Sequence, residues 1–118
     1  MTQGRRGLLG LGAGLLAAPP VLAQGAGGWA PSRPIRILVG FPPGQATDTI
    51  ARLLAEKLGE NPGWQMVIEN RPGQGGSLAA AAAAQAAPDG HTLLLSATAP
   101  RATNPTLYRN IGYDPPRD

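Results

Sequence analysis

Three short segments of the sequence carry residue types that could bind a ligand: residues 40–47, 70–77 and 96–104. The first two are rich in glycine, which lets a ligand approach the backbone, and each leads into a predicted helix. The third is rich in hydroxyl side chains. Because the first turn of a helix has unpaired backbone N–H groups and a partial positive charge, these segments favour a small anion. Each segment taken alone is also typical of a plain tight turn.

Catalysis and metal binding find little support in the residue types. The sequence has no cysteine, a single histidine and no G-x-S-x-G motif, which would place a hydrolase nucleophile on a sharp turn. His91 begins a predicted strand, where we expect a structural role. Asp48 and Glu69 are interpreted as a helix-end residue and a strand-end residue rather than as a catalytic pair. We therefore expect no catalytic residue, no metal site and no cofactor.

A dinucleotide-binding motif is the nearest enzymatic alternative. Residues 73–78 read GQGGSL between a predicted strand and a predicted helix, which is close to G-x-G-x-x-G. However, Leu78 stands where the third glycine belongs. The next predicted strand ends with Leu95 and Ser96, where an acidic residue should bind the ribose. Dinucleotide binding is therefore the weaker interpretation.

Five alternating elements must position the three segments. Apolar runs at 35–39, 65–69 and 92–95 are typical of buried strands. Helical patterns at 47–59 and 77–87 separate these strands. The order β-α-β-α-β predicts an α/β fold with a parallel sheet and helices on its faces. Ligands of open parallel sheets bind beyond the carboxyl ends of the strands, which is where the three segments fall.

The first helix has the clearest local pattern. Thr47 is predicted as its N-cap, and Asp48 follows in the first turn, where a negative charge suits the helix dipole. Arg52 and Glu56 are spaced as an ion pair on the solvent side. Ser77 is predicted to cap the second helix. Large apolar side chains at helical spacing predict the face of the first helix that packs on the sheet: Ile50, Leu53, Leu54 and Leu58.

The N-terminal residues predict export. Paired arginines precede an uncharged apolar stretch at 8–18, which is shorter than the about 20 residues that cross a bilayer. A small-residue cleavage pattern ends at Ala23. Residues 1–23 are therefore predicted to be a signal peptide cleaved after Ala23, with the Sec and twin-arginine routes both open. Residues 24–33, rich in glycine, alanine and proline, are predicted to be a flexible lead-in.

The charge balance gives no sign of a nucleic-acid partner. The chain has ten lysines and arginines against seven acidic residues. Without the two arginines of the predicted signal, eight basic residues face seven acidic ones, and the eight form no basic run. A nucleic-acid footprint needs a basic stripe or patch, so we expect none. The lack of cysteine also excludes disulfides and a lipid-modified cysteine.

Four motifs in order along the chain resemble the Bug family of solute-binding proteins, the TctC-like receptors of tripartite tricarboxylate transporters. The first is PIRILVGFPPG at 34–44, and the second is VIENRPGQGG at 67–76. The third is APDGHTLL at 87–94, and the fourth combines NPTLY and YDP within 104–115. The resemblance runs from about residue 31 to the last residue, without notable gaps.

The resemblance implies a type II periplasmic-binding-protein-like fold with two domains that close over a small organic acid. The family delivers its ligand to membrane permease subunits, and we expect a monomer in the periplasm. Residues 34–118 would be part of the first domain. Gln45 departs from the family, which usually has a second glycine there, so the ligand stays open. The expected ligand-binding residues are Phe41, Pro43, Gly44, Gln45, Ala46, Thr47, Asp48, Gly75, Gly76, Ser96, Ala97 and Thr98.

The small number of elements predicts a piece of a larger protein. Three strands and two helices make at most half of a doubly wound sheet. Members of the family are much longer than this chain. A non-functional product of a truncated gene is therefore the main alternative to a working receptor, because one half of a cleft cannot close over a ligand.

Overall fold

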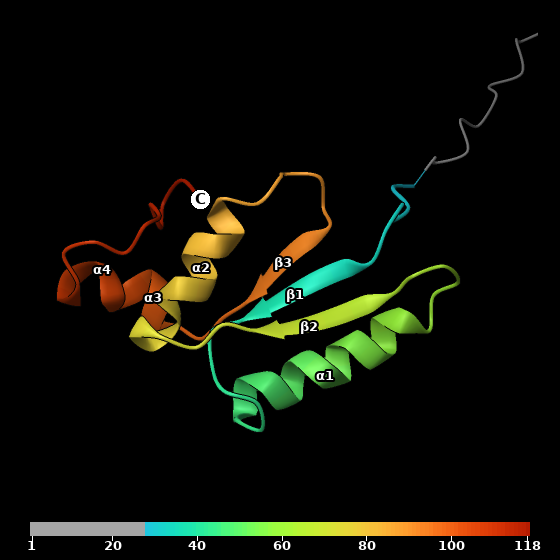
Figure 1. The fold of residues 1–118 in the computed structure, drawn as a ribbon, viewed down its shortest axis with the longest axis horizontal. Coiled ribbons are helices and arrows are strands. Elements are labelled where there is room, and N and C mark those ends of the chain that lie inside the picture. Colours follow the sequence, from blue (N-terminus) through green and yellow to red (C-terminus); the bar gives the residue numbers. More distant parts are fainter. Residues whose placement is uncertain (1–27) are drawn as a thin grey trace, which may run out of the picture.

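A computed structural model of the protein describes residues 28–118, in which three strands alternate with helices (Figure 1). The strands are β1 (Ile35–Val39), β2 (Met66–Asn70) and β3 (Thr92–Leu95). The helices are α1 (Ala46–Gly59), α2 (Ser77–Ala84), α3 (Ala99–Ala102) and α4 (Asn104–Leu107), and a short 3-10 turn, η1 (Gln74–Gly76), precedes α2. The predicted signal peptide and residues 24–27 lie outside the described residues. Within residues 28–118, no helix has the length and apolarity that a membrane span requires.

The strands form one parallel sheet in the order β2-β1-β3. Val39 lies opposite both Asn70 and Leu95, so the three strands end level with one another. α1 packs against β1 and β2, whereas α2 packs against β1 and β3 on the other side of the sheet (Figure 1). The predicted α/β fold with a parallel sheet is confirmed. The strands at 35–39 and 92–95 have the predicted bounds, and β2 lies one residue later than predicted.

The core is built around the central strand. Ile37 and Val39 are buried and pack with Ala51 of α1. Leu38, which points to the other face because side chains alternate along a strand, is buried as well. A helix on each face of the sheet therefore explains why β1 is a continuous apolar run.

α1 packs on the sheet through a different face from the predicted one. Ala51 is fully buried and Ala55 packs against the core. Three large residues of the predicted face are exposed instead: Ile50 by 57%, Leu53 by 60% and Leu54 by 40%. The prediction that these three side chains face the core is wrong. Alanine on the contact face lets the helix axis approach the sheet, and this choice turns the neighbouring stripe of large side chains to solvent.

The predicted helix caps are also wrong. The N-cap of α1 is Gln45, which makes no side-chain capping bond, and Thr47 lies inside the helix. α2 follows Gly76, so Ser77 is its first helical residue, and the helix ends at Ala84, earlier than predicted. The N-cap lies two residues earlier than predicted in α1 and one residue earlier in α2, because contacts outside the helix set where the backbone turns.

Residues 28–33, the described end of the predicted lead-in, are tied to the turn before β3. Nη2 of Arg33 donates to Oδ2 of Asp89 at 2.7 Å, and the backbone N–H of Ser32 donates to Nε2 of His91 at 3.1 Å. Because Nε2 accepts a hydrogen bond, the proton of the neutral ring is on Nδ1, which lies 3.1 Å from the backbone oxygen of Asp89. His91 is 5% exposed and has the structural role expected of it.

The Asp89 carboxylate makes this contact sensitive to acid. The hydrogen bond from the His91 backbone, followed by that from Arg33, lowers the pKa of Asp89 from 3.8 to about 2. A carboxyl whose pKa is lower in the folded chain stabilises the fold above its unfolded pKa, and this contribution is lost as the pH falls toward the folded pKa.

We therefore expect Asp89→Asn to flatten the decline in unfolding free energy between pH 3.8 and about 2. The effect should be small because Asp89 is 42% exposed and solvent screens its charge. Urea unfolding followed by circular dichroism at several pH values measures the decline. An equally steep decline in the variant and the wild type would contradict the prediction.

Candidate functional site

The three candidate segments begin at the same edge of the sheet. Because the strands are parallel and end level, Gly40, Arg71 and Ser96 all follow carboxyl ends at this edge. In the sheet, β2 lies on one side of β1 and β3 lies on the other. The strand order therefore reverses at β1, which places a topological switch point between β1 and β3. Loops at such a switch point lead to opposite faces of the sheet and leave a crevice between them. We call residues 40–48 and 96–98, which follow β1 and β3 at this edge, the rim.

The N-terminus of α1 is the strongest anion-attracting feature of the rim. α1 is 14 residues long, and the N–H groups of its first three residues, Ala46, Thr47 and Asp48, have no partner within the helix. The first N–H to bond along the helix is that of Thr49. No other acceptor for these three N–H groups is found among residues 28–118. Three free donors at the positive end of a long helix suit a carboxylate.

Asp48 is buried beneath this helix end. Its side chain is 2% exposed, and its Oδ2 accepts hydrogen bonds from the Gly44 backbone N–H at 2.9 Å and from Nε of Arg52 at 2.8 Å. Its Oδ1 accepts from Nδ2 of Asn70 at 2.9 Å. Arg52 thus pairs with Asp48, whereas the sequence predicted a pair between Arg52 and Glu56. The hydrogen bond from Arg52, followed by those from Gly44 and Asn70, holds the pKa of Asp48 well below its usual range, so the group is ionised at neutral pH.

Asn70 begins the second candidate segment but was not among the expected ligand-binding residues. It ends β2 and reaches across to the loop after β1, where its Nδ2 donates to the backbone oxygen of Phe41 at 3.0 Å and to Oδ1 of Asp48 at 2.9 Å. Its place at the junction of a strand and a glycine-rich turn was a usable signal. Its partners are 29 and 22 residues away in the sequence, so the pairing of β1 with β2 is what brings them together.

The two glycines predicted in the second segment lie close to other parts of the protein. Gly76 is buried, and a Cβ on it would lie 2.9 Å from Cγ of Pro100. A Cβ on Gly75 would lie 3.2 Å from the side-chain amide of Asn104, which is 3% exposed and donates to Oγ of Ser77 at 2.8 Å. Tight packing accounts for both glycines, and a ligand contact at either stays a prediction.

The third segment adds hydroxyl groups to the rim. Ser96 is half-buried, and its hydroxyl donates to the backbone oxygen of Ala97 at 3.1 Å. Thr98 is exposed, precedes α3 and makes no capping bond through its side chain. α3 has only four residues, so its dipole adds little. The hydroxyl of Thr98 is therefore the main contribution of this segment.

Nine of the twelve predicted ligand-binding residues are exposed or half-buried residues of the rim. The exposed ones are Pro43, Gly44, Gln45, Ala46, Ala97 and Thr98, and the half-buried ones are Phe41, Thr47 and Ser96. Asp48 and Gly76 are buried, and Gly75 is exposed on the second segment.

The arrangement at the rim offers hydrogen-bond donors for binding. Within residues 28–118, no three His, Asp or Glu side chains gather closely enough to hold a metal ion. His91 precedes β3 and therefore lies at the opposite edge of the sheet from the rim. The chemistry that the rim supports is the binding of an anion.

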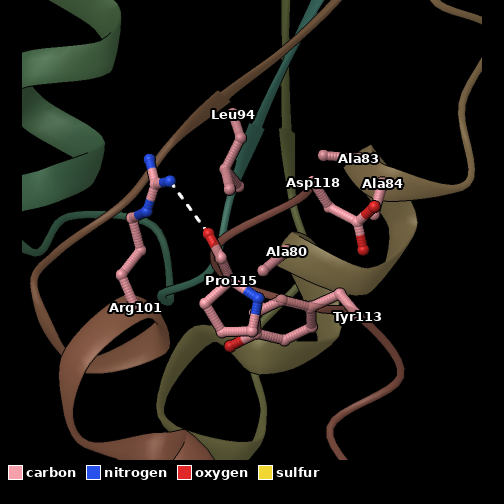
Figure 2. Close-up of a pocket in the computed structure, with 8 residues that line it drawn as sticks. All are labelled: Ala80, Ala83, Ala84, Leu94, Arg101, Tyr113, Pro115 and Asp118. Atoms are coloured by element: carbon pink, nitrogen blue, oxygen red, sulfur yellow. Dashed lines mark hydrogen bonds between the residues drawn. The ribbon is translucent and has the colours of Figure 1, made fainter.

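A hollow of about 260 Å³ lies apart from the rim, between α2, β3 and the C-terminal segment (Figure 2). Nη2 of Arg101 donates to the backbone oxygen of Pro115 at 3.1 Å within it. None of the predicted ligand-binding residues lines this hollow. Its lining consists of Ala80, Ala83, Ala84, Leu94, Arg101, Tyr113, Pro115 and Asp118.

The comparison with protein families decides the identity of the chain. The model of the tripartite tricarboxylate transporter family receptor, TctC, matches residues 50–118, more than half of the sequence. The chain belongs to the TctC family. Protein BugT of Bordetella pertussis is 46% identical over 84 residues, which are 70% of this chain and 26% of BugT. A UPF0065 protein of Bordetella bronchiseptica is 39% identical over 114 residues, which are 92% of this chain and 34% of the relative.

Solved structures place this TctC chain among periplasmic binding proteins. The periplasmic binding protein BugD matches with a TM-score of 0.65 and 39% identity, over 73% of this chain and 28% of BugD. R. palustris Rpa4515 with adipate matches with a TM-score of 0.69 and 41% identity, over 73% of this chain and 29% of that one. The predicted Bug/TctC-like family and fold are confirmed. The chain spans about a quarter to a third of the length of these relatives.

Proposed function

We propose that this TctC chain belongs to a periplasmic receptor and that its rim binds a carboxylate group of a small organic acid. The observation that carries the proposal is the N-terminus of α1, where three backbone N–H groups have no acceptor among residues 28–118. The structure of Rpa4515 with adipate, a dicarboxylate, supports the choice of ligand class.

The charges around α1 are compatible with an anionic ligand. A carboxylate oxygen at the helix end would accept hydrogen bonds from Ala46 and Thr47, and the hydroxyl of Thr98 would donate from the segment after β3. Asp48 is the negative charge nearest these donors in sequence, and its ion pair with Arg52 at 2.8 Å offsets it. Gln45 is exposed at the rim, and its amide offers a further contact that would tune the choice of ligand.

The remaining parts of the proposal concern the whole receptor. The signal peptide is cleaved after Ala23, and the mature protein acts in the periplasm as a monomer without cofactor or catalytic activity. Residues 34–118 form part of its first domain, and it hands its ligand to membrane permease subunits. The family, a class of transporter receptors, supports this assignment. A non-functional product is the alternative, and a binding experiment separates the two.

Adipate added to the chain should shift the amide resonances of Ala46, Thr47 and Thr98 in two-dimensional NMR spectra, with millimolar affinity. Binding is expected to be weak because one rim contacts only one side of the ligand. Adipamide, which has the same length and no charge, is the matched control and should leave these resonances in place. Equal shifts with both compounds, or shifts confined to other amides, would refute the proposed site.

A further inference from the structure

The loop between β1 and α1 is held by side chains from outside it. Phe41 and Gly44 bracket two prolines, which have no N–H and so donate no hydrogen bond within the loop. The turn-type hydrogen bond within this loop, which Gln45 N–H donates to the Pro42 oxygen, is long at 3.4 Å. Gly44 adopts a left-handed φ of 89°, which few other residues tolerate. The shape of the loop therefore depends on its remaining contacts.

Those contacts come from Asp48 and Asn70. The Asn70 amide donates to the backbone oxygen of Phe41 at 3.0 Å, and the Asp48 carboxylate accepts from the Gly44 N–H at 2.9 Å. The two side chains also bond to each other at 2.9 Å. One continuous set of hydrogen bonds thus joins the end of β2 to both sides of the two prolines.

The geometry assigns Asp48 and Asn70 as positioning residues that hold the β1–α1 loop in its ligand-binding shape, an inference that rests on the proposed function. Asp48 is 2% exposed, and both of its oxygens already accept hydrogen bonds. Nδ2 of Asn70 donates its hydrogen bonds to the backbone oxygen of Phe41 and to Oδ1 of Asp48. The pair therefore acts on the ligand through the free N–H groups of α1, whose direction the loop sets.

Asn70→Ala tests the assignment, with adipate as the probe and the wild-type chain as the reference. The Gly44 amide should exchange its hydrogen faster, and adipate should bind about tenfold more weakly, because the loop must then be ordered on binding. Asp48→Asn is the second variant. It keeps the side-chain shape and one oxygen, but in either orientation its NH2 group faces a donor, the Asn70 amide or the Gly44 N–H, so it should weaken binding in the same direction.

Asn61→Ala is the control, because Asn61 is another asparagine whose side-chain amide ties a backbone oxygen, that of Leu58 at 2.9 Å, and it follows the C-terminal end of α1, at the other end of the helix from the rim. It should leave adipate affinity unchanged. In the double variant of Asp48 and Asn70, the loss of affinity should be smaller than the sum of the single losses, because both residues belong to one set of hydrogen bonds.

The outcomes separate this inference from the proposed function. Wild-type affinity in Asn70→Ala, or an equal loss in Asn61→Ala, would overturn the positioning role alone. If the wild-type chain gives no adipate-specific shifts at the rim, the proposed function fails and the positioning role fails with it.

Discussion

Ile37→Ala is expected to lower the free energy of unfolding by about 3 kcal/mol, or to unfold the chain outright. Ile37 is 1% exposed on the central strand and packs with Val39 and Ala51. Removing its side-chain carbons loses their transfer free energy and leaves a cavity that β1, paired on both sides, has little freedom to close. A domain of this size has a small core, so the loss is a large part of its stability.

Leu53→Ala is the matched comparison, because it makes a similar change on α1. Leu53 is 60% exposed, so we expect a change below about 0.5 kcal/mol. Urea unfolding of both variants, followed by circular dichroism, gives the two free energies. A loss in Leu53→Ala as large as that in Ile37→Ala would mean that α1 packs through its leucines and that the orientation of the helix is wrong.

Gly40→Ala should destabilise the protein by a similar amount, about 3 kcal/mol. Gly40 directly follows β1, and a Cβ there would lie 2.6 Å from the Cα of Gly76. The obstacle is backbone and not the end of a flexible side chain, so the turn before α2 must move away from the sheet. The same movement would displace Phe41 and disturb the rim.

Gly59→Ala is the control for this substitution. Gly59 ends α1, and a Cβ there would meet no atom within 4 Å. Alanine lowers the conformational entropy of the unfolded chain and favours the helix, so we expect a gain of about 0.5 kcal/mol. Thermal unfolding of the two variants should shift the midpoint in opposite directions. Unchanged stability in Gly40→Ala would contradict the packing of β1 against the turn before α2, and a loss in Gly59→Ala would contradict the open space around the end of α1.

The strands show how far local pattern carries in this protein. Apolar runs between turn residues located β1 and β3 at their observed bounds, because strand burial on both faces leaves a direct mark on composition. Alternation of strands and helices also predicted the parallel sheet, and with it the common edge where the three candidate segments begin. Four family motifs in order predicted the TctC family, which the comparison confirmed.

The face of α1 shows where local pattern stops. Helical spacing identifies a helix, but two neighbouring stripes of α1 are apolar, one of alanine and one of larger residues. Spacing alone predicts that the face with the larger residues packs on the sheet, since these residues have more apolar surface to bury. The sheet selected Ala51 and Ala55, because close approach of the helix axis requires small side chains at the contact.

The sequence by itself determined the class of fold, the location of the strands, the family and the glycine- and hydroxyl-rich segments at one edge of the sheet. Only the tertiary structure decided that Asp48 is buried in a set of hydrogen bonds with Gly44, Arg52 and Asn70. The reason is physical: strand and helix patterns arise from neighbours a few residues apart. The bond between Asp48 and Asn70 joins residues 22 positions apart and exists only once β1 and β2 have paired.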